Sequence, residues 1–179
     1  MSDSSDETLI QRYRAGHAGA FDQLYARYRQ PLFSYLHRQV NQQGLAEDLF
    51  QDIWMRVINN LEQWQDDGHF KAWLFRVAHN RLIDHWRAQK PAAADAEDDI
   101  QSAQPWPERW ALLSQCVELL FKLLAGLNPQ QRDAFVLQQE SGLTLEQIAS
   151  VCGCNRETVK SRLRYAVQRL RQGLEGCDD

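Results

Sequence analysis

The chain has 179 residues, of which 44% are hydrophobic and 25% charged, and its formal net charge is −4. This is the composition of a globular protein, with enough chain for one domain or two small ones. The acidic balance argues against indiscriminate nucleic-acid binding. No apolar run approaches the roughly 20 residues of a membrane span, and the polar start is unlike a signal or transit peptide. Four cysteines lack the density of a disulfide framework, so a reducing cytoplasm is expected.

Residues 7–40 are predicted to form two helices. Leu9, Ile10 and Tyr13 have helical spacing, and Gly16 and Gly19 are expected to close or interrupt that helix. Apolar side chains continue at helical spacing to residue 31, a proline, and a further apolar face follows it. The aromatic residues of this segment are interpreted as core.

Residues 44–64 read as one long amphipathic helix, with an inward stripe of apolar residues every four positions. Acidic residues gather near the start of the outward side, where the helix dipole alone would favour them. Phe50 and Trp54 beside them are expected to be exposed. Aromatic anchors among charges favour a protein-binding patch.

Residues 69–90 predict a basic aromatic helix, because residues 70–90 hold five Lys or Arg and a single Asp. Its apolar residues form two stripes. The first stripe consists of Phe70, Trp73, Leu74 and Val77, and the second of Phe75, His79, Leu82 and Trp86. Aromatic residues mixed with arginine suit single-stranded nucleic acid, whose bases stack on flat side chains. The structural alternative is a helix that is buried on two sides.

Residues 91–110 change composition: three prolines, small residues and five acids indicate a flexible acidic linker and a domain boundary. A helix is then predicted over residues 112–124. Asn128 and Pro129 predict the start of another helix, which runs on to Gly142. No segment alternates as a β-strand does. The fold is therefore predicted to be all-α, in two small helical domains of residues 1–90 and 111–179.

Residues 144–171 predict a helix-turn-helix. Thr144 and Gln147 form a capping-box pattern, Gly153 ends the first helix and Asn155 can cap the second. An apolar stripe (Val159, Leu163, Ala166, Val167, Leu170) must be buried. Residues 156–171 hold six Lys or Arg against one acid, whereas an ordinary solvated face mixes signs. The N-terminal residues of such a helix, here Arg156, Glu157 and Lys160, lie nearest the base edges in the DNA major groove.

The search for catalytic and metal-binding patterns gives no site. Cys152 and Cys154 have neither a second cysteine pair nor a histidine at zinc spacing, and packing in the small helix-turn-helix core explains Cys152 better. No phosphate loop or hydrolase motif is present. His69, His79 and His85 are interpreted as surface or stacking residues. We therefore expect that the protein is not an enzyme and that it binds no cofactor and no metal ion.

Bacterial RNA polymerase sigma factors are similar to this chain in separated segments. Their region two resembles AEDLFQDIW (46–54) followed by FKAWLFRVAHNRLIDHWR (70–87), and their opening helices resemble AFDQLYARYRQPLFSYL (20–36). Their region four resembles LNPQQRDAFVLQQESGLTLEQIA followed by RETVKSRLRYAVQRL (127–170). Nearly the whole chain is covered in order, apart from the linker. Two such regions with no domain between them resemble the extracytoplasmic-function (ECF) group.

The resemblance implies a role for each predicted site. The RNA polymerase core, through its clamp helices, is expected to bind Asp48, Gln51, Asp52 and Trp54. Opening and reading of the promoter −10 element, with capture of an unstacked base under the loop 65–68, is expected of Asp66, Asp67, Gly68, Phe70, Lys71, Trp73, Arg76, Asn80, Asp84 and Arg87. Reading of the −35 element is expected of Arg156, Glu157, Lys160, Ser161, Arg162 and Arg164.

Further partners follow from the same resemblance. The acidic linker is expected to thread toward the polymerase active-site cleft. An anti-sigma factor, often membrane-anchored in this group, is expected to hold the protein inactive and could retain this cytoplasmic chain at the inner membrane. Two departures from the family are Asp52, where Glu is usual, and Tyr165, where Arg is common.

Two other classes of function remain open on the residues alone. A two-domain DNA-binding regulator would explain residues 144–171 but neither the basic aromatic helix nor the acidic-aromatic surface. An all-helical adaptor that binds only protein would be supported by the net charge alone.

Overall fold

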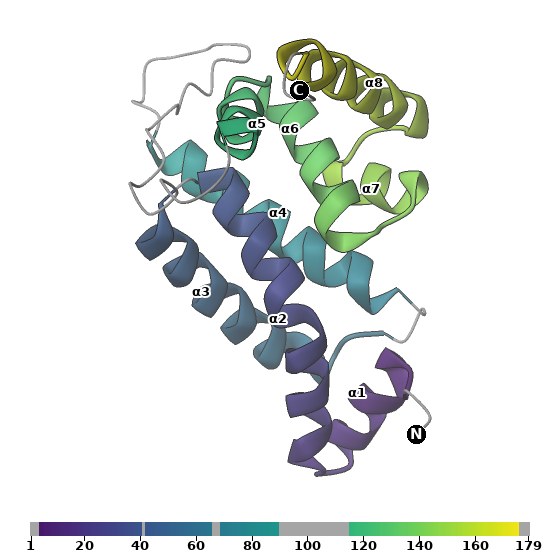
Figure 1. Ribbon diagram of the computed structural model, residues 1–179. Helices are drawn as coiled ribbons and strands as arrows, with labels where there is room; N and C mark the ends of the chain where they lie inside the picture. The colour runs from purple at the N-terminus through teal and green to yellow at the C-terminus, as the bar shows by residue number, and fades with distance from the viewer. Residues whose placement is uncertain (1–3, 41, 66–68, 90–114, 176–179) are drawn as a thin grey trace.

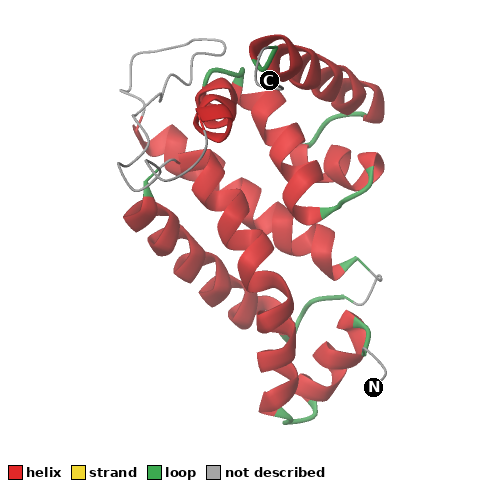
Figure 2. Cartoon of the chain, viewed as in Figure 1, coloured by secondary structure: helices red, strands yellow, loops and turns green. Residues whose placement is uncertain are grey.

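The computed structural model describes residues 4–40, 42–65, 69–89 and 115–175. Within these ranges every regular element is a helix (Figures 1 and 2), so the predicted all-α class is confirmed. The elements are α1 (Asp6–Arg14), α2 (Ala18–Val40), α3 (Gln43–Leu61), α4 (Phe70–Gln89), α5 (Gln115–Ala125), α6 (Pro129–Val136), the π-helical turn η2 (Leu137–Ser141), α7 (Leu145–Cys152) and α8 (Arg156–Gly173). None of them is long and apolar enough to cross a membrane.

The first two helices meet at Gly16 rather than at the proline. Gly16 adopts φ 93, which only glycine reaches without strain, so the chain turns sharply there. Pro31 lies inside α2, which continues through it to Val40. A proline removes one helical hydrogen bond. Burial of the apolar residues on both sides, Leu24 and Tyr28 before it and Leu32 after it, keeps the helix intact.

The end of α3 is fixed by α1. The guanidinium of Arg14 donates to the backbone carbonyl of Leu61 from Nη2 at 2.8 Å and from Nε at 3.2 Å, and it also donates to the carbonyl of Trp64. Terminal helix carbonyls lack partners within the helix, and an arginine side chain satisfies them well. The chain therefore leaves α3 in a defined direction towards α4.

Trp54 belongs to the core, and the expectation that it is exposed is wrong. Only 4% of it is exposed, and its ring lies 4.9 Å from that of Tyr25 and 5.8 Å from that of Phe21, with both of these on α2. Phe50, one turn earlier, is partly buried against the same helix. The side of α3 that carries Phe50 and Trp54 thus faces α2 and not solvent.

The helix-turn-helix forms as its capping residues predict. The Thr144 hydroxyl accepts from the backbone amide of Gln147 at 3.2 Å, and the side-chain carbonyl of Gln147 accepts from the backbone amide of Thr144 at 3.0 Å. Gly153, at φ 64, ends α7, and the Asn155 side chain accepts from the Thr158 amide to begin α8. The α8 stripe is buried except for Val167, which is 39% exposed.

The helices α1–α4 (the N-terminal half) and α5–α8 (the C-terminal half) pack directly against each other. Figure 1 shows α7 lying against α4, and α6 with η2 beside α2. One cluster of buried apolar side chains runs through both halves, from Leu24 and Phe75 to Ile148 and Val159. A smaller cluster holds α5 to α8 through Phe121, Leu124 and Leu170.

The aromatic packing of α3 predicts how its variants behave. Trp54→Ala should lower the free energy of unfolding by about 3–5 kcal/mol, because it leaves a large cavity between α2 and α3. Met55→Ala, at the adjacent position that is 57% exposed, should change it by less than about 0.5 kcal/mol. Urea denaturation followed by circular dichroism measures both. Equal effects of the two substitutions would contradict the burial of Trp54.

Candidate nucleic-acid and partner interfaces

The first turns of α8 present a solvent-exposed basic face. Arg156, Lys160 and Arg164 are all exposed, and they follow one another at four-residue spacing. Arg156 contacts Glu146 of α7 at 2.6 Å, and Lys160 contacts Glu157 at 3.1 Å. Exposed ion pairs of this kind contribute little stability, so they can be exchanged for other anionic partners at small cost.

Two of the residues predicted for this interface lie differently. Arg162 is partly buried and turned inward, where its guanidinium donates to the Gln130 side chain on α6 and to the Cys154 sulfur at 3.5 Å. It therefore braces the turn against α6 and does not share the exposed face. Ser161 is partly buried as well. The exposed face consists of Arg156, Glu157, Lys160 and Arg164.

One face of α4 is open to solvent. Trp73, Val77, Asn80, Asp84 and Arg87 fall on the same side of the helix, because their spacing of three and four residues keeps them within a quarter of a turn. The last three are exposed, and the first two are partly buried. Lys71 is partly buried near the start of this helix.

A hollow of about 580 Å³ lies at the start of that face. Trp73, Val77 and Asn80 line it from α4, Arg56 and Asn60 line it from α3, and residues 63–65 close one side. The Trp73 ring rests 5.7 Å from Phe70 and 6.4 Å from Trp64. A flat side chain is thus held at the rim of a partly polar hollow. The predicted residues Asp66, Asp67 and Gly68 lie outside the described residues, as does the predicted linker of residues 91–110.

The opposite side of α4 is not a stacking surface. Phe75, on this side, is fully buried and packs edge-on to Tyr35 of α2, and Phe70 of the first stripe is fully buried as well. The second stripe faces inward: Leu82 is buried, and His79 and Trp86 border a cavity whose other wall is Pro129 and Asp133 of α6. For this second stripe, the structural alternative of burial against neighbouring helices is therefore correct.

The acidic surface of α3 is narrower than predicted. Asp48 and Gln51 are exposed, whereas Asp52 is partly buried and ion-paired with Arg81 of α4 and, at 3.3 Å, with Arg56. Trp54 belongs to the core, as described above. Arg81, which the sequence analysis did not single out, therefore fixes α3 to α4.

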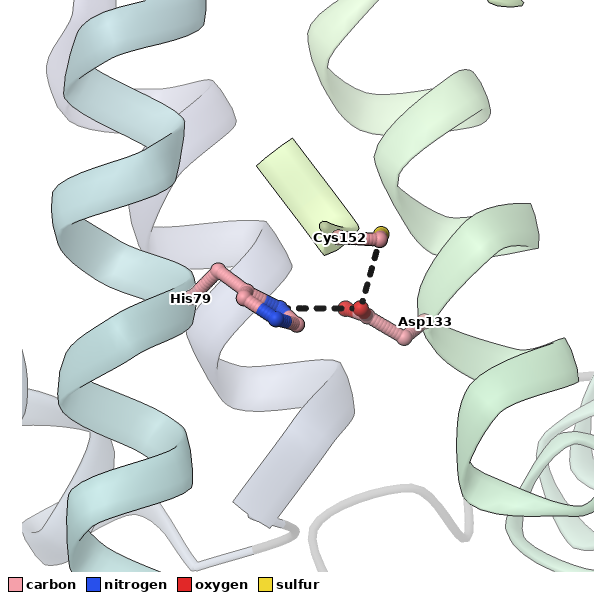
Figure 3. Close-up of side chains that lie close together, drawn as sticks. All are labelled: His79, Asp133 and Cys152. Carbon is pink, nitrogen blue, oxygen red and sulfur yellow. Dashed lines mark hydrogen bonds and ion pairs between the residues drawn. The ribbon is translucent and has the colours of Figure 1, made fainter. Parts of the chain in front are cut away.

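A buried carboxylate marks the junction between the halves. Asp133 of α6 accepts hydrogen bonds at Oδ1 from the Tyr35 hydroxyl (2.8 Å) and the Gln39 amide (3.1 Å) of α2. At Oδ2 it faces the thiol of Cys152 (3.4 Å) and His79 Nδ1 (3.0 Å), as Figure 3 shows. His79, predicted at the surface or in stacking, has a side chain that is only 14% exposed. Sequence analysis missed this cluster because its members are far apart in the chain.

The junction alters the acidity of its neutral members. Burial, reinforced by the negative charge of Asp133, raises the pKa of Tyr35 well above its usual value. The same two causes raise the pKa of the Cys152 thiol. Both groups therefore stay protonated at neutral pH and act as hydrogen-bond donors to the carboxylate.

Further polar contacts surround this junction. Arg38 of α2 is ion-paired with Glu140 of η2, and its guanidinium lies 5.2 Å over the ring of Phe121 on α5. Arg76, predicted for promoter opening, is exposed but donates to the hydroxyl of Ser150 on α7. In this arrangement Arg76 bridges the two halves.

The comparisons with known proteins fit these two halves. The family described as Sigma-70 region 2 matches residues 24–92, and the family described as Sigma-70, region 4 matches residues 123–172. Together these regions span about two thirds of the chain. The chain belongs to the sigma-70 family. Sigma factors are transcription initiation factors rather than enzymes.

Curated relatives place this sigma factor in the ECF group. It is 29% identical over 166 residues to the ECF RNA polymerase sigma factor BldN of Streptomyces coelicolor, covering 90% of this chain but only 63% of that protein. It is 28% identical to the RNA polymerase sigma-H factor of Pseudomonas aeruginosa (98% of this chain, 96% of that protein). It is 27% identical to the ECF RNA polymerase sigma-E factor of Escherichia coli (89% and 88%).

Solved structures share the fold. The sigma factor RpoE of Bartonella quintana, in complex with the anti-sigma factor NepR, superimposes with a TM-score of 0.68 at 26% identity, covering 87% of this chain and 96% of that one. CnrH in complex with the cytosolic domain of CnrY gives a TM-score of 0.71 at 23% identity, covering 98% and 100%. At that identity the second likeness concerns the fold alone.

The capping of α8 leads to a test of how its first turn is held. Asn155→Ala should cost about 1 kcal/mol of unfolding free energy, because the Thr158 amide loses its acceptor. Asn155→Gly should cost only a few tenths of that amount, since glycine also suits a helix N-cap. Thermal or urea unfolding of the two variants side by side measures the difference. If the alanine variant were as stable as the glycine variant, the prediction that the Asn155 side chain stabilises α8 as an N-cap would be wrong.

Proposed function

We propose that this sigma factor binds core RNA polymerase, recognises −10 and −35 promoter elements and directs initiation at a specific set of promoters. The observation that carries the proposal is the pairing of two solvent-facing sites, one on each region of the family. The first turns of α8 offer a basic face in region four, and the open face of α4 borders a hollow in region two. A simple DNA-binding regulator needs only the first.

The α8 face suits direct reading of duplex DNA. A recognition helix places its N-terminal side chains against base edges in the major groove. Arg156 and Lys160 can donate to guanine, and Glu157 can accept from cytosine, each good contact contributing about 1–3 kcal/mol of discrimination. Arg164, one turn further along, is proposed to contact the phosphate backbone.

The open face of α4 suits an unpaired strand. Among its aromatic residues, Trp73 is the best candidate to stack on an unstacked base, since it is partly exposed at the rim of the hollow while Phe70 and Phe75 are buried. Stacking of one base contributes about 1–3 kcal/mol, which can offset the cost of unstacking. Asn80 and Arg56 supply polar partners in the same hollow.

The remaining partners complete the proposal. Asp48 and Gln51 offer an exposed polar surface on α3 to the clamp helices of the polymerase core. An anti-sigma factor is proposed to control access to these surfaces, in line with the anti-sigma complex of the Bartonella quintana relative. We place the protein in the cytoplasm, where its proposed partners are.

The promoter-reading role of α8 is tested by charge reversal. Lys160→Glu should reduce transcription from a −35-dependent promoter by at least about 10- to 100-fold, through loss of a base contact and repulsion of phosphate. Arg169→Glu is the matched control, with the same change in charge at an exposed position about 13 Å further along the helix axis. Transcription with purified core polymerase measures both, and binding to core should remain unchanged. A loss of core binding by Lys160→Glu would mean that α8 is misassigned.

The polymerase-binding role of α3 is tested at Asp48, because the Asp52 carboxylate is already paired with Arg81. Asp48→Arg should weaken binding to core polymerase by about tenfold or more, as expected when a charge at an interface is reversed. Asp22→Arg, at an exposed acid on α2, is the control. Titration of core with labelled protein gives both affinities. If Asp48→Arg bound core as tightly as Asp22→Arg, this surface would not be the dock.

A further inference from the structure

Three side chains of different chemistry converge at the junction between the halves. His79 comes from α4, Asp133 from α6 and Cys152 from α7, and Figure 3 shows all three directed toward one point. One nitrogen, one carboxylate oxygen and one sulfur lie within 4.8 Å of one another. Imidazole, carboxylate and thiolate are the three ligand types that zinc uses in proteins.

Two of their three separations are close to those around a tetrahedral ion. Zinc–ligand bonds of about 2.0–2.3 Å place the nitrogen and oxygen ligands about 3.3 Å apart, and the sulfur and oxygen ligands about 3.5 Å apart. The His79 Nδ1 to Asp133 Oδ2 distance is 3.0 Å, and the Cys152 Sγ to Asp133 Oδ2 distance is 3.4 Å. Shifts of a few tenths of an ångström bring these two distances to tetrahedral values. The third pair, His79 and Cys152, lies within 4.8 Å and has to approach to about 3.5 Å when the ion binds.

The buried ring nitrogen of His79 has no hydrogen-bond partner among the described residues. Nδ1 of His79 is buried beside Oδ2 of Asp133, yet it makes no hydrogen bond with any described residue, since the geometry to that oxygen is unsuitable. A buried polar atom without a partner is costly in a native protein and asks for an explanation. An ion held between the two lone pairs supplies one.

The surroundings provide the outer interactions that metal sites need. Oδ1 of Asp133 is held by Tyr35 and Gln39, which leaves Oδ2 for the ion. Metal-binding carboxylates are commonly fixed by such second partners. A cavity of about 170 Å³ borders the three ligands, which is room for a water molecule in a fourth position.

We propose that His79, Asp133 and Cys152 bind one zinc-class divalent cation that links the N-terminal and C-terminal halves. On binding, the Cys152 thiol releases its proton to solvent and the thiolate joins neutral imidazole and ionised carboxylate. The two negative ligands then balance the charge of the ion. Because its ligands come from both halves, the ion stabilises their packed arrangement. Control of promoter reading by this metal rests on the proposed function; the binding site itself does not.

Cobalt(II) is the probe for the site, since its thiolate charge-transfer band reports sulfur ligation directly and its visible bands report tetrahedral geometry. The full chain, reduced and freed of metal, should bind one cobalt ion with both signals, and zinc should displace it. Cys152→Ser should lose the charge-transfer band. Cys154 is also a free cysteine, two residues away, and Cys154→Ser should keep the band. No thiolate band in the unaltered chain, or a band that survives in Cys152→Ser, would overturn the proposal.

The bridge between the halves is tested at His79, which is the only ligand from the N-terminal half among the three. His79→Gln should weaken zinc binding on the order of 100-fold, measured by competition with a chromophoric chelator, whereas His85→Gln on the same helix should not. Tyr35→Phe should cost about 10- to 100-fold through the second-partner effect. Unchanged affinity in His79→Gln would confine the ion to the C-terminal half and refute the bridge. Circular dichroism of the metal-free variants verifies that each remains folded.

Because the ion holds the two halves in their packed arrangement, zinc should also lower promoter-specific transcription by the unaltered chain and by Cys154→Ser, but not by Cys152→Ser. If no form of the chain supports transcription with core polymerase, the proposed function fails while the cobalt result still decides the metal site. If transcription occurs and zinc has the same effect on all three proteins, the metal does not act through this site, and its control of promoter reading is refuted.

Discussion

The packed arrangement of this sigma factor depends on how the carboxylate of Asp133 is satisfied. An ionised group in a protein interior is tolerated only when hydrogen bonds replace the water it has lost. Tyr35 and Gln39 supply those bonds across the junction, and Cys152 supplies one from the C-terminal half. The carboxylate thus requires α2, α6 and α7 to be in register, which an apolar contact alone would not enforce.

Around that junction the helices divide their faces between packing and recognition. The open face of α4, with Trp73 and Asn80, borders a hollow, while its second stripe packs on the C-terminal half. In the same way α8 buries its apolar stripe and leaves Arg156 and Lys160 in solvent. Each recognition surface is therefore the reverse side of a packed helix, so its side chains are presented from a rigid backbone.

Local signals in the sequence predicted local structure well. The caps at Thr144 and Asn155 and the glycine at 153 set α7 and α8 because their hydrogen bonds join residues three or four apart. Side-chain environment was harder to predict, because it depends on which helices meet. Trp54 was expected in solvent, yet the neighbouring helix covers it. A search for metal ligands by spacing could not join residues 79, 133 and 152, since only the fold brings them together.

The second stripe of α4 has a consequence for the balance between states. If the halves separated, His79, Ile83 and Trp86 would lose Pro129, Asp133 and Cys152, the residues of the C-terminal half that now face them across a cavity. Uncovered apolar area costs about 25 cal/mol for each Å² in contact with water, whereas Asp133 would regain its hydration. In the isolated protein, the balance of these two opposing free-energy changes sets the population of molecules whose two halves are separated. A macromolecule that covers the apolar residues of α4 exposed in this way would increase the population of the separated form by mass action.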